Sequence, residues 1–314
     1  MNLAVRRGVS TRHAYVSFVD HGYREIGLNW IATAPRDVLE ATTIFTTDNV
    51  SLTALKPVAV RAHLPKEGLK RYSTECQVFH SKWLLKHAIV LAVLLEANRT
   101  KKIDFVTWFD IDCLILKPYH SWLNQKLARL SRSDDIDLFA QRGVHPRHVY
   151  ERVGATICLG LFTVRPSAVE FYESFWSSIT VKPASPDENS VNEVEYRINC
   201  KEDDQWAFNV HVDKWMGLNY SMLLKNDLNV DSELVISNEL RARTDRQIIT
   251  AFLPYAEFPR SLSSELNITE FQQLRDKGAR VWHMGADKTG EGKKIAMQRD
   301  GVWLLRVDPG NEWS

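Results

Sequence analysis

Residues 105–116 read Phe-Val-Thr-Trp-Phe-Asp-Ile-Asp-Cys-Leu-Ile-Leu, an apolar run interrupted by two acids. A run so rich in aromatic and β-branched residues predicts a buried strand at the centre of a sheet. In extended backbone Asp110 and Asp112 would point the same way, because side chains alternate with a period of two. Two buried carboxylates without partners repel each other. A divalent cation such as Mg²⁺ or Mn²⁺ would resolve that repulsion, and two acids that cap a following turn or helix are the alternative.

The composition is that of an ordinary globular protein. The chain has 314 residues, 44% of them hydrophobic and 25% charged, which is enough for one large α/β domain or two small ones. Its 40 basic and 39 acidic residues give a net charge of +1. The net charge therefore gives no reason to expect binding to nucleic acid or to an anionic membrane. The longest apolar run, residues 88–95, is too short to cross a bilayer. We expect no nucleic-acid partner and no membrane span in this chain.

The cellular compartment is suggested only by the first residues and the cysteines. Residues 1–11 lack an apolar core long enough for a signal peptide. Cys76, Cys113, Cys158 and Cys200 have no Cys-x-x-Cys spacing, so a reducing, cytoplasmic location is the simplest expectation. The alternative is the lumen of the secretory pathway after loss of an anchor, and a Cys76–Cys200 bridge stays open.

Apolar periodicity predicts strands that alternate with helices. Such alternation favours a mostly parallel central sheet flanked by helices. Residues 141–151 are polar and basic and are predicted to form a loop, and the pattern is weak over residues 212–279. Besides the central strand, we expect strands at 13–19, 42–47, 57–60, 137–140, 155–164 and 279–284, and helices at 25–34, 79–96, 121–130, 165–178 and from 201 onward.

Polar residues follow several of these strands. In an open α/β sheet, ligands bind outside the carboxyl ends of the strands, where Asp112 and His283 could meet. Two carboxylates and one imidazole suit Mn²⁺ better than Mg²⁺, although a histidine in the core is the simpler interpretation of His283 alone. The lysines and glycines after His283 suit a diphosphate. Lys82 and Lys86 share one helix face, either as solvated lysines or as cations that face phosphates.

Taken in order, these motifs resemble those of the nucleotide-diphospho-sugar transferase family, glycosyltransferases of the GT-A type with an Asp-x-Asp motif. Residues 16–23 resemble the family's first strand and nucleotide-binding turn, and residues 109–118 its Asp-x-Asp signature with a following proline. Residues 160–167 are similar to its glycine-containing strand-to-helix junction, and residues 204–209 to its Asp-Gln-x-x-x-Asn. Cys158 stands where an asparagine is common.

The resemblance implies a single, Rossmann-like GT-A domain over residues 1–314. Residues 13–112 would be its nucleotide-binding half and residues 113–305 its half for the sugar and the acceptor. Asp110, Asp112 and His283 would hold Mn²⁺ or Mg²⁺, with Asp110 also near the ribose. Asp204 and Gln205 would be catalytic, at the anomeric face of the sugar. Contacts to the donor are implied for Phe18, Val19, Asp20, Tyr23, Lys82, Lys86, Asp110, Ile111, Gly160, Lys288 and Lys293.

The implied activity is the transfer of a sugar to a hydroxyl group. The donor would be a nucleotide-diphosphate sugar, with uridine as the default base, and the acceptor a carbohydrate or glycoconjugate. Retention of the anomeric configuration follows from the family's retaining members. Asp204 would be an orienting group or, in an inverting enzyme, a general base.

Two other functions compete with this one. Phe109–Leu114 resembles the Phe-Asp-x-Asp-Gly-Thr opening of haloacid-dehalogenase-type phosphatases, in which Asp110 would be the nucleophile and Asp112 the general acid. Leu114 replaces the usual Thr or Val, however, and no later Gly-Asp-x-x-x-Asp appears. A nucleotide-sugar-binding module without catalysis is the second alternative. The intact acids and His283 weigh against it.

Overall fold

The computed structural model describes residues 12–56, 58–62, 74–128, 136–153, 155–180, 203–216, 235–236, 248, 250–260, 273, 276–283 and 289–305. In these residues the strands are β1 (His13–Val19), β2 (Thr42–Thr46), β3 (Ala59–Arg61), β4 (Phe105–Phe109), β5 (Cys113–Ile115), β6 (Leu138–Gly143), β7 (Thr156–Val164), β8 (Val235–Ile236), β9 (Thr250–Phe252) and β10 (Val281–His283). The α-helices are α1 (Arg24–Thr33), α2 (Arg36–Glu40), α3 (Asn49–Ala54), α5 (Thr74–Thr100), α6 (Tyr119–Leu127), α7 (Arg147–Val153), α8 (Val169–Thr180), α9 (Asp204–Met216) and α11 (Gly290–Arg299).

Eight of these strands form one sheet in the order β3-β2-β1-β4-β7-β6-β9-β8. Strands β3, β2, β1 and β4 are mutually parallel, β7 and β8 run against their neighbours, and β6 and β9 are parallel to each other. The predicted α/β fold with a mostly parallel central sheet flanked by helices is confirmed. The chain winds outward from β1 to β3 and then returns to β1's other side with β4. The carboxyl ends of β1 and β4 therefore flank the topological switch point at which open α/β sheets bind ligands.

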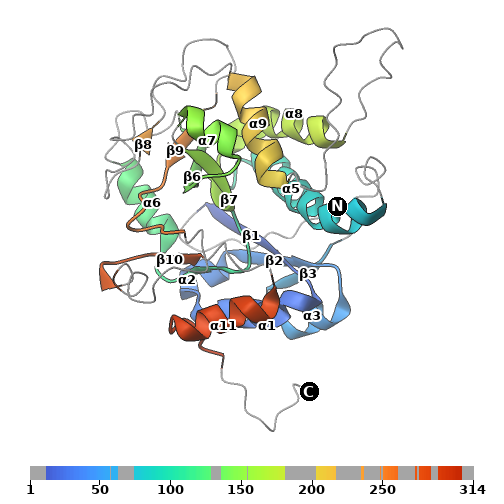
Figure 1. The fold of residues 1–314 in the computed structure, drawn as a ribbon, viewed down its shortest axis with the longest axis vertical. Coiled ribbons are helices and arrows are strands. Elements are labelled where there is room, and N and C mark those ends of the chain that lie inside the picture. The colour runs from blue at the N-terminus through green and yellow to red at the C-terminus, as the bar shows by residue number, and fades with distance from the viewer. Residues whose placement is uncertain are drawn as a thin grey trace.

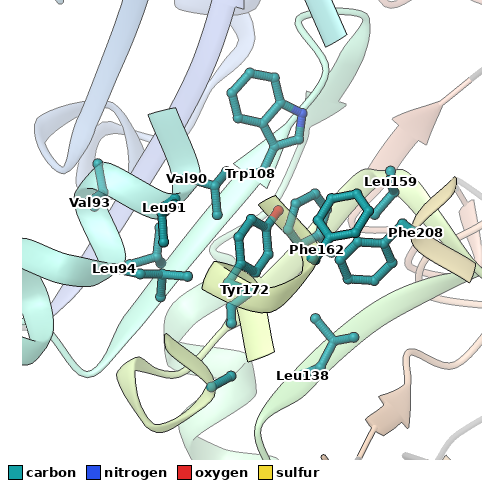
Figure 2. Close-up of a cluster of buried hydrophobic side chains, with 14 of the residues drawn as sticks. Val90, Leu91, Val93, Leu94, Trp108, Leu138, Leu159, Phe162, Tyr172 and Phe208 are labelled. Carbon is teal, nitrogen blue, oxygen red and sulfur yellow. The ribbon is translucent and has the colours of Figure 1, made fainter. Parts of the chain in front are cut away.

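Helices cover both faces of the sheet (Figure 1). One core cluster packs α5, α8 and α9 against the sheet, and Figure 2 shows Phe162 of β7, Tyr172 of α8 and Phe208 of α9 in it. A second cluster packs α1, α6 and α11 against the opposite face. Because both clusters draw residues from either side of residue 112, the two proposed halves of the chain share their cores.

The structure corrects the prediction that Asp110 and Asp112 lie in extended backbone. Strand β4 ends at Phe109, the chain turns through Asp110–Asp112, and β5 then leaves the main sheet to pair with β10. The two acids thus lie in a turn rather than in extended backbone. The apolar residues resume after the acids because β5 is buried as well, so the pattern did not reveal that β5 belongs to a different sheet.

The predicted loop over residues 141–151 is also wrong. Its first residues complete β6, and residues from Arg147 form α7. Helix α5 is longer than predicted at both ends. Residues 181–194, most of 212–279, Cys200 and Lys288 lie outside the described residues, so predictions on them stay untested. None of the described helices combines the length and apolar composition needed to cross a membrane.

A group of buried, hydrogen-bonded polar side chains lies among the residues of the second core cluster. His13 Nε2 lies 2.6 Å from Thr107 Oγ1, which lies 2.7 Å from Thr163 Oγ1. His120 Nδ1 lies 3.2 Å from Tyr15 Oη. Burial lowers the pKa of His13 well below its usual value, and the nearby His120 lowers it further. Burial also lowers the pKa of His120, against an opposing effect of Asp37.

These histidines should make the fold sensitive to acid. The unfolded chain binds protons at a pH near 6.5 at which the folded histidines stay neutral, so the free energy of unfolding should fall as pH drops from about 7 to about 5, by on the order of 1 kcal/mol per pKa unit. Urea unfolding at the two pH values measures this loss. His13→Gln should reduce it, whereas His148→Gln, which removes an exposed histidine, should leave it unchanged. If the free energy of unfolding depends on pH equally in His13→Gln and in the parent protein, then His13 is not a source of the acid sensitivity.

Candidate metal and nucleotide-diphosphate site

The turn that carries the two acids is held from both sides. Asp110 N donates to Gly160 O at 2.7 Å, and Cys113 N donates to Asp110 O at 2.7 Å. From α1, the Trp30 ring stacks on Phe109 at a centroid distance of 4.4 Å, and Trp30 Nε1 donates to Cys113 O at 3.2 Å. The backbone of the turn is therefore fixed between the end of β4 and the start of β5.

Strand β10 brings His283 to this turn. In the antiparallel pair of β5 and β10, His283 lies opposite Cys113, the residue that follows Asp112. One ligand atom from each of Asp110, Asp112 and His283 lies within 4.8 Å of the other two. The predicted convergence of these residues at the carboxyl ends of the strands is therefore observed. Their role as metal ligands stays a prediction.

Hydrogen bonding orients the His283 ring. Its Nδ1 lies 2.8 Å from Gln141 Oε1, while Gln141 Nε2 donates to Phe258 O and Pro259 O. The Gln141 oxygen can only accept, so Nδ1 carries the proton and Nε2 keeps its lone pair. Burial lowers the pKa of His283 to about 3, although Asp112 acts in the opposite direction. The ring is neutral at physiological pH, which is the form that binds metal ions.

Gly160 makes room for His283. A Cβ atom at this position would lie 2.1 Å from His283 Cε1, far inside contact distance. The ladder between β6 and β7 also shifts register between Ala140 and Gln141, opposite this part of β7. An isolated glycine inside a strand is typical of a bulge or of a close approach. Both are observed here, and the approaching group is the imidazole. A donor contact at Gly160 stays a prediction.

Lys86 of α5 links two of the predicted site acids. Its Nζ lies 3.1 Å from Asp110 Oδ1 and 2.8 Å from Asp204 Oδ2, with 8% of the side chain exposed. The interpretation as a solvated lysine is therefore wrong. Burial alone would lower the pKa of Lys86, but Asp110 and Asp204 raise it above its usual value. The ammonium group stays charged between the two carboxylates.

The two acids of the turn differ in their surroundings. Although 37% of the Asp110 side chain is exposed, desolvation raises its pKa, and Lys86 offsets only part of that rise. Burial would also raise the pKa of Asp112, but Lys293 and His283 outweigh it and hold the pKa below its usual value. Lys293 Nζ, on α11, lies 2.8 Å from Asp112 Oδ2. Asp112 is therefore the more firmly ionised member of the pair.

Asp204 and Gln205 lie at the start of α9, as the sequence predicts. Asp204 contacts Lys86 and also His87 Nε2, at 3.4 Å, and His87 Nδ1 lies 3.0 Å from Tyr172 Oη. Burial would raise the pKa of Asp204, but Lys86 and His87 hold it well below its usual value. Gln205 Oε1 accepts from Leu159 N at 3.4 Å, and its Nε2 donates to the His145 carbonyl at 2.8 Å. Both side chains are engaged with protein groups, and their catalytic role stays a prediction.

The predicted nucleotide-binding turn lies at the end of β1. Asp20 forms an ion pair with Lys82, which is 53% exposed, and Asp20 Oδ1 is buried without a hydrogen-bond partner. Helix α11 begins against this turn, since a Cβ atom at Gly290 would lie 2.3 Å from Gly22 O. Among the other predicted donor contacts, Phe18 and Tyr23 are partly exposed, while Val19 and Ile111 pack into the core, so only their backbone could reach a ligand.

Several site residues were missed in the sequence. Gln141 was assigned to a loop, and its place after the apolar residues of β6 was the available signal. Trp108, which donates from Nε1 to Asp110 Oδ1 at 2.8 Å, and His87 had no polar pattern to distinguish them from core residues. Arg260 has a buried Nε and Nη1 without hydrogen-bond partners, and its charge lowers the pKa of His283.

The residues present fit a divalent cation. Two carboxylates and the Nε2 lone pair of an oriented, neutral histidine form the kind of oxygen and nitrogen donor set that Mn²⁺ accepts. The hydrogen bond from His283 to Gln141 is of the type that orients metal-binding histidines.

Gly160→Ala should displace His283. The added methyl group overlaps the imidazole, and such overpacking costs about 1–3 kcal/mol. Urea unfolding should show this loss for the single variant, and the double variant Gly160→Ala/His283→Ala should lose less than the sum of the two single variants. Additive losses would show that the ring and the methyl group do not compete for space.

Lys86→Met should strongly destabilise the fold. It leaves Asp110 and Asp204 without their shared cation, and breaking a buried ion pair costs about 3–5 kcal/mol. The control is Lys82→Met, which removes a half-exposed pair with Asp20 and should cost at most about 1 kcal/mol. Urea unfolding compares the two variants. If both variants lose equally little free energy of unfolding, the ion pairs of Lys86 with Asp110 and Asp204 do not stabilise the fold as expected.

Neither a protein-family model nor a curated protein matches this chain, but solved structures do. A galactosyltransferase, LgtC, solved with donor and acceptor sugar analogs, is 10% identical with a TM-score of 0.47, over 94% of this chain and 98% of that one. A glycosyltransferase involved in glycosylation of the major capsid of PBCV-1 is 10% identical with a TM-score of 0.40, over 91% and 98%. The glycosyltransferase GlyE of Streptococcus pneumoniae TIGR4 is 9% identical with a TM-score of 0.41, over 95% and 61%. All three are named as galactosyl- or glycosyltransferases.

Proposed function

We propose that this chain is a metal-dependent glycosyltransferase of the GT-A type. It moves a sugar from a nucleotide-diphosphate donor, by default a uridine diphosphate sugar, to a hydroxyl group of a carbohydrate or glycoconjugate. The observation that carries the proposal is the cluster of Asp110, Asp112 and His283 at the switch point between β1 and β4. When bound there, Mn²⁺ or Mg²⁺ supplies Lewis-acid stabilisation of a departing diphosphate.

The surroundings of the cluster suit the two ends of such a donor. Asp20 Oδ1 offers a buried acceptor without a partner to an N–H or O–H group of the nucleoside. The start of α11 lies against the Asp20–Tyr23 turn, and the N-terminus of a helix favours negative charge. We therefore propose that residues 13–112 contact the nucleotide and that residues 113–305 make most of the contacts to the sugar and the acceptor.

Positive side chains converge on the cluster from two helices. Lys86 reaches it from α5 and Lys293 from α11, on opposite faces of the sheet. Ammonium groups placed where a diphosphate gains charge stabilise it as it leaves. Lys82 at the rim and Lys288, outside the described residues, complete the set of lysines that we assign to the phosphates.

The state of Asp204 supports retention rather than inversion. Inversion requires a general base, and Asp204 is ionised but committed to Lys86 and His87. Gln205 is an amide with both ends hydrogen-bonded, which makes it a weak nucleophile. We therefore propose that both residues position the sugar and the β7 backbone, and that the acceptor is deprotonated on the face from which the diphosphate leaves. The anomeric configuration of the product, read by NMR, tests this.

The phosphatase alternative finds no support in the arrangement of the acids. Asp110 follows the fourth strand of the chain instead of the first, and its Oδ1 is already bound by Lys86 and Trp108. A nucleophilic carboxylate needs an accessible oxygen in line with the phosphate, and a histidine metal ligand is not part of that motif.

A panel of nucleotide sugars with Mn²⁺ tests the proposed function. We expect transfer to a simple saccharide, or slow hydrolysis, with at least one donor, and a loss of at least about 100-fold for Asp112→Ala and for His283→Ala. Asp137→Asn is the control, because this carboxylate precedes β6 and accepts from Ser167 at the end of the strands opposite to the site. If no donor binds and Asp112→Ala changes nothing, the proposal fails. Phosphatase activity that is lost in Asp110→Asn would instead favour the alternative.

A further inference from the structure

Lys293 occupies a position at Asp112 that a metal ion would also use. Its Nζ lies 2.8 Å from Asp112 Oδ2, and its side chain is 3% exposed. The next residue, Lys294, points elsewhere, to Glu25 Oε2 at 2.7 Å and toward the Trp303 ring. The two lysines thus have different partners although they are neighbours on one helix.

The position of Lys293 is set by the packing of α11. Thr289 caps the helix, with its Oγ1 accepting from Gly292 N at 3.1 Å. At the other end, Asp300 accepts from Trp282 Nε1 of β10 at 2.8 Å. Asn29 Oδ1 accepts from Leu304 N at 2.7 Å and fixes the segment that follows. The helix is therefore held in place, and only the long stem of Lys293 leaves its ammonium group room to exchange partners.

The charges of the cluster are partly balanced without any metal, since two ammonium groups face three carboxylates. The carboxylates of Asp110 and Asp112 face the ammonium groups of Lys86 and Lys293, and Lys86 is shared with Asp204. A divalent cation that approaches the Asp-x-Asp turn alone is repelled by the two ammonium groups and must break the pair between Lys293 and Asp112. A diphosphate that approaches alone meets lysines already engaged by carboxylates. Each ligand alone therefore loses much of its Coulombic gain.

The two ligands together remove this conflict. A cation can replace the ammonium group at Asp112, while the released ammonium group can bind a phosphate oxygen. We infer that Lys293 is a counterion that exchanges between Asp112 and the diphosphate, so that the divalent cation and the diphosphate bind cooperatively and each binds weakly alone. This rests on the proposed function. By linkage, the diphosphate must raise the affinity for the cation by the same factor as the cation raises the affinity for the diphosphate.

Calorimetry with Mn²⁺ alone, UDP alone and the two together measures this coupling. For the parent protein, saturating UDP should raise the affinity for Mn²⁺ at least about tenfold. Lys293→Met should bind Mn²⁺ alone about tenfold more tightly than the parent protein, because no ammonium group competes for Asp112. The factor by which UDP raises the Mn²⁺ affinity should fall about tenfold, which leaves the part that comes from direct contact between the cation and the diphosphate. Lys293→Gln keeps a polar group of similar length and should behave in the same way. The matched control is Lys294→Met, which removes the neighbouring lysine and should leave both affinities and their coupling unchanged.

The outcomes separate this inference from the proposed function. If the parent protein binds Mn²⁺ and UDP but with no coupling, or if both Lys293 variants match the parent protein, the exchange is wrong and the glycosyltransferase proposal stands. If Mn²⁺ does not bind even with UDP, both fail. Circular dichroism confirms that each variant is folded. The comparison of the Lys293 variants with Lys294→Met separates the contribution of Lys293 from the direct contact between the cation and the diphosphate.

Discussion

The pairing of β10 with β5 is the constraint on which the site depends. Each strand has three residues, and a shift of one residue would turn His283 to the opposite face of this small sheet. In the observed register His283 lies beside the Asp-x-Asp turn, over Gly160, with Gln141 holding its Nδ1. Residues from β6, β7 and β10, which are distant in sequence, thus define the orientation of one imidazole ring.

The price of assembling this site is the burial of several charged groups. Three carboxylates, Asp110, Asp112 and Asp204, lie close together in a largely buried region, an arrangement that is unfavourable without cations. Lys86 and Lys293 offset it, each from a helix on a different face of the sheet. Hydrophobic residues of similar volume would often give a more stable core. Under the proposed function, the ions at the switch point serve to bind the cation and the diphosphate.

The same lysines connect the stability of the fold to its proposed chemistry. Lys86 lies between the metal cluster and Asp204, so a diphosphate or a cation at the cluster changes what Asp204 can do. Lys293 contacts Asp112 from α11, the helix whose first residue, Gly290, lies against the Asp20–Tyr23 turn. Charge can be redistributed within this network by small movements of flexible side chains, while the turns and strands that carry the acids stay fixed. A site of this kind can respond to ligands without a change of fold.

The sequence by itself determined the class of fold and the acids of the site. Alternating strands and helices, the Asp-x-Asp after an apolar run, and a histidine at the end of the last strand are local patterns, and each is visible in a few residues. The glycine at position 160 was also informative, because an isolated glycine in a strand signals a bulge or a close contact.

Only the tertiary structure decided how these residues meet. The change of sheet between β4 and β5 was invisible because both strands are buried and therefore equally apolar. The partners of Lys86, Lys293 and His283 are set by helix packing and by the register of β10, which involve residues far apart in the chain. The sequence around a lysine on a helix is the same whether the lysine faces water or two carboxylates. Its partners come from other segments of the chain, which only the fold brings close.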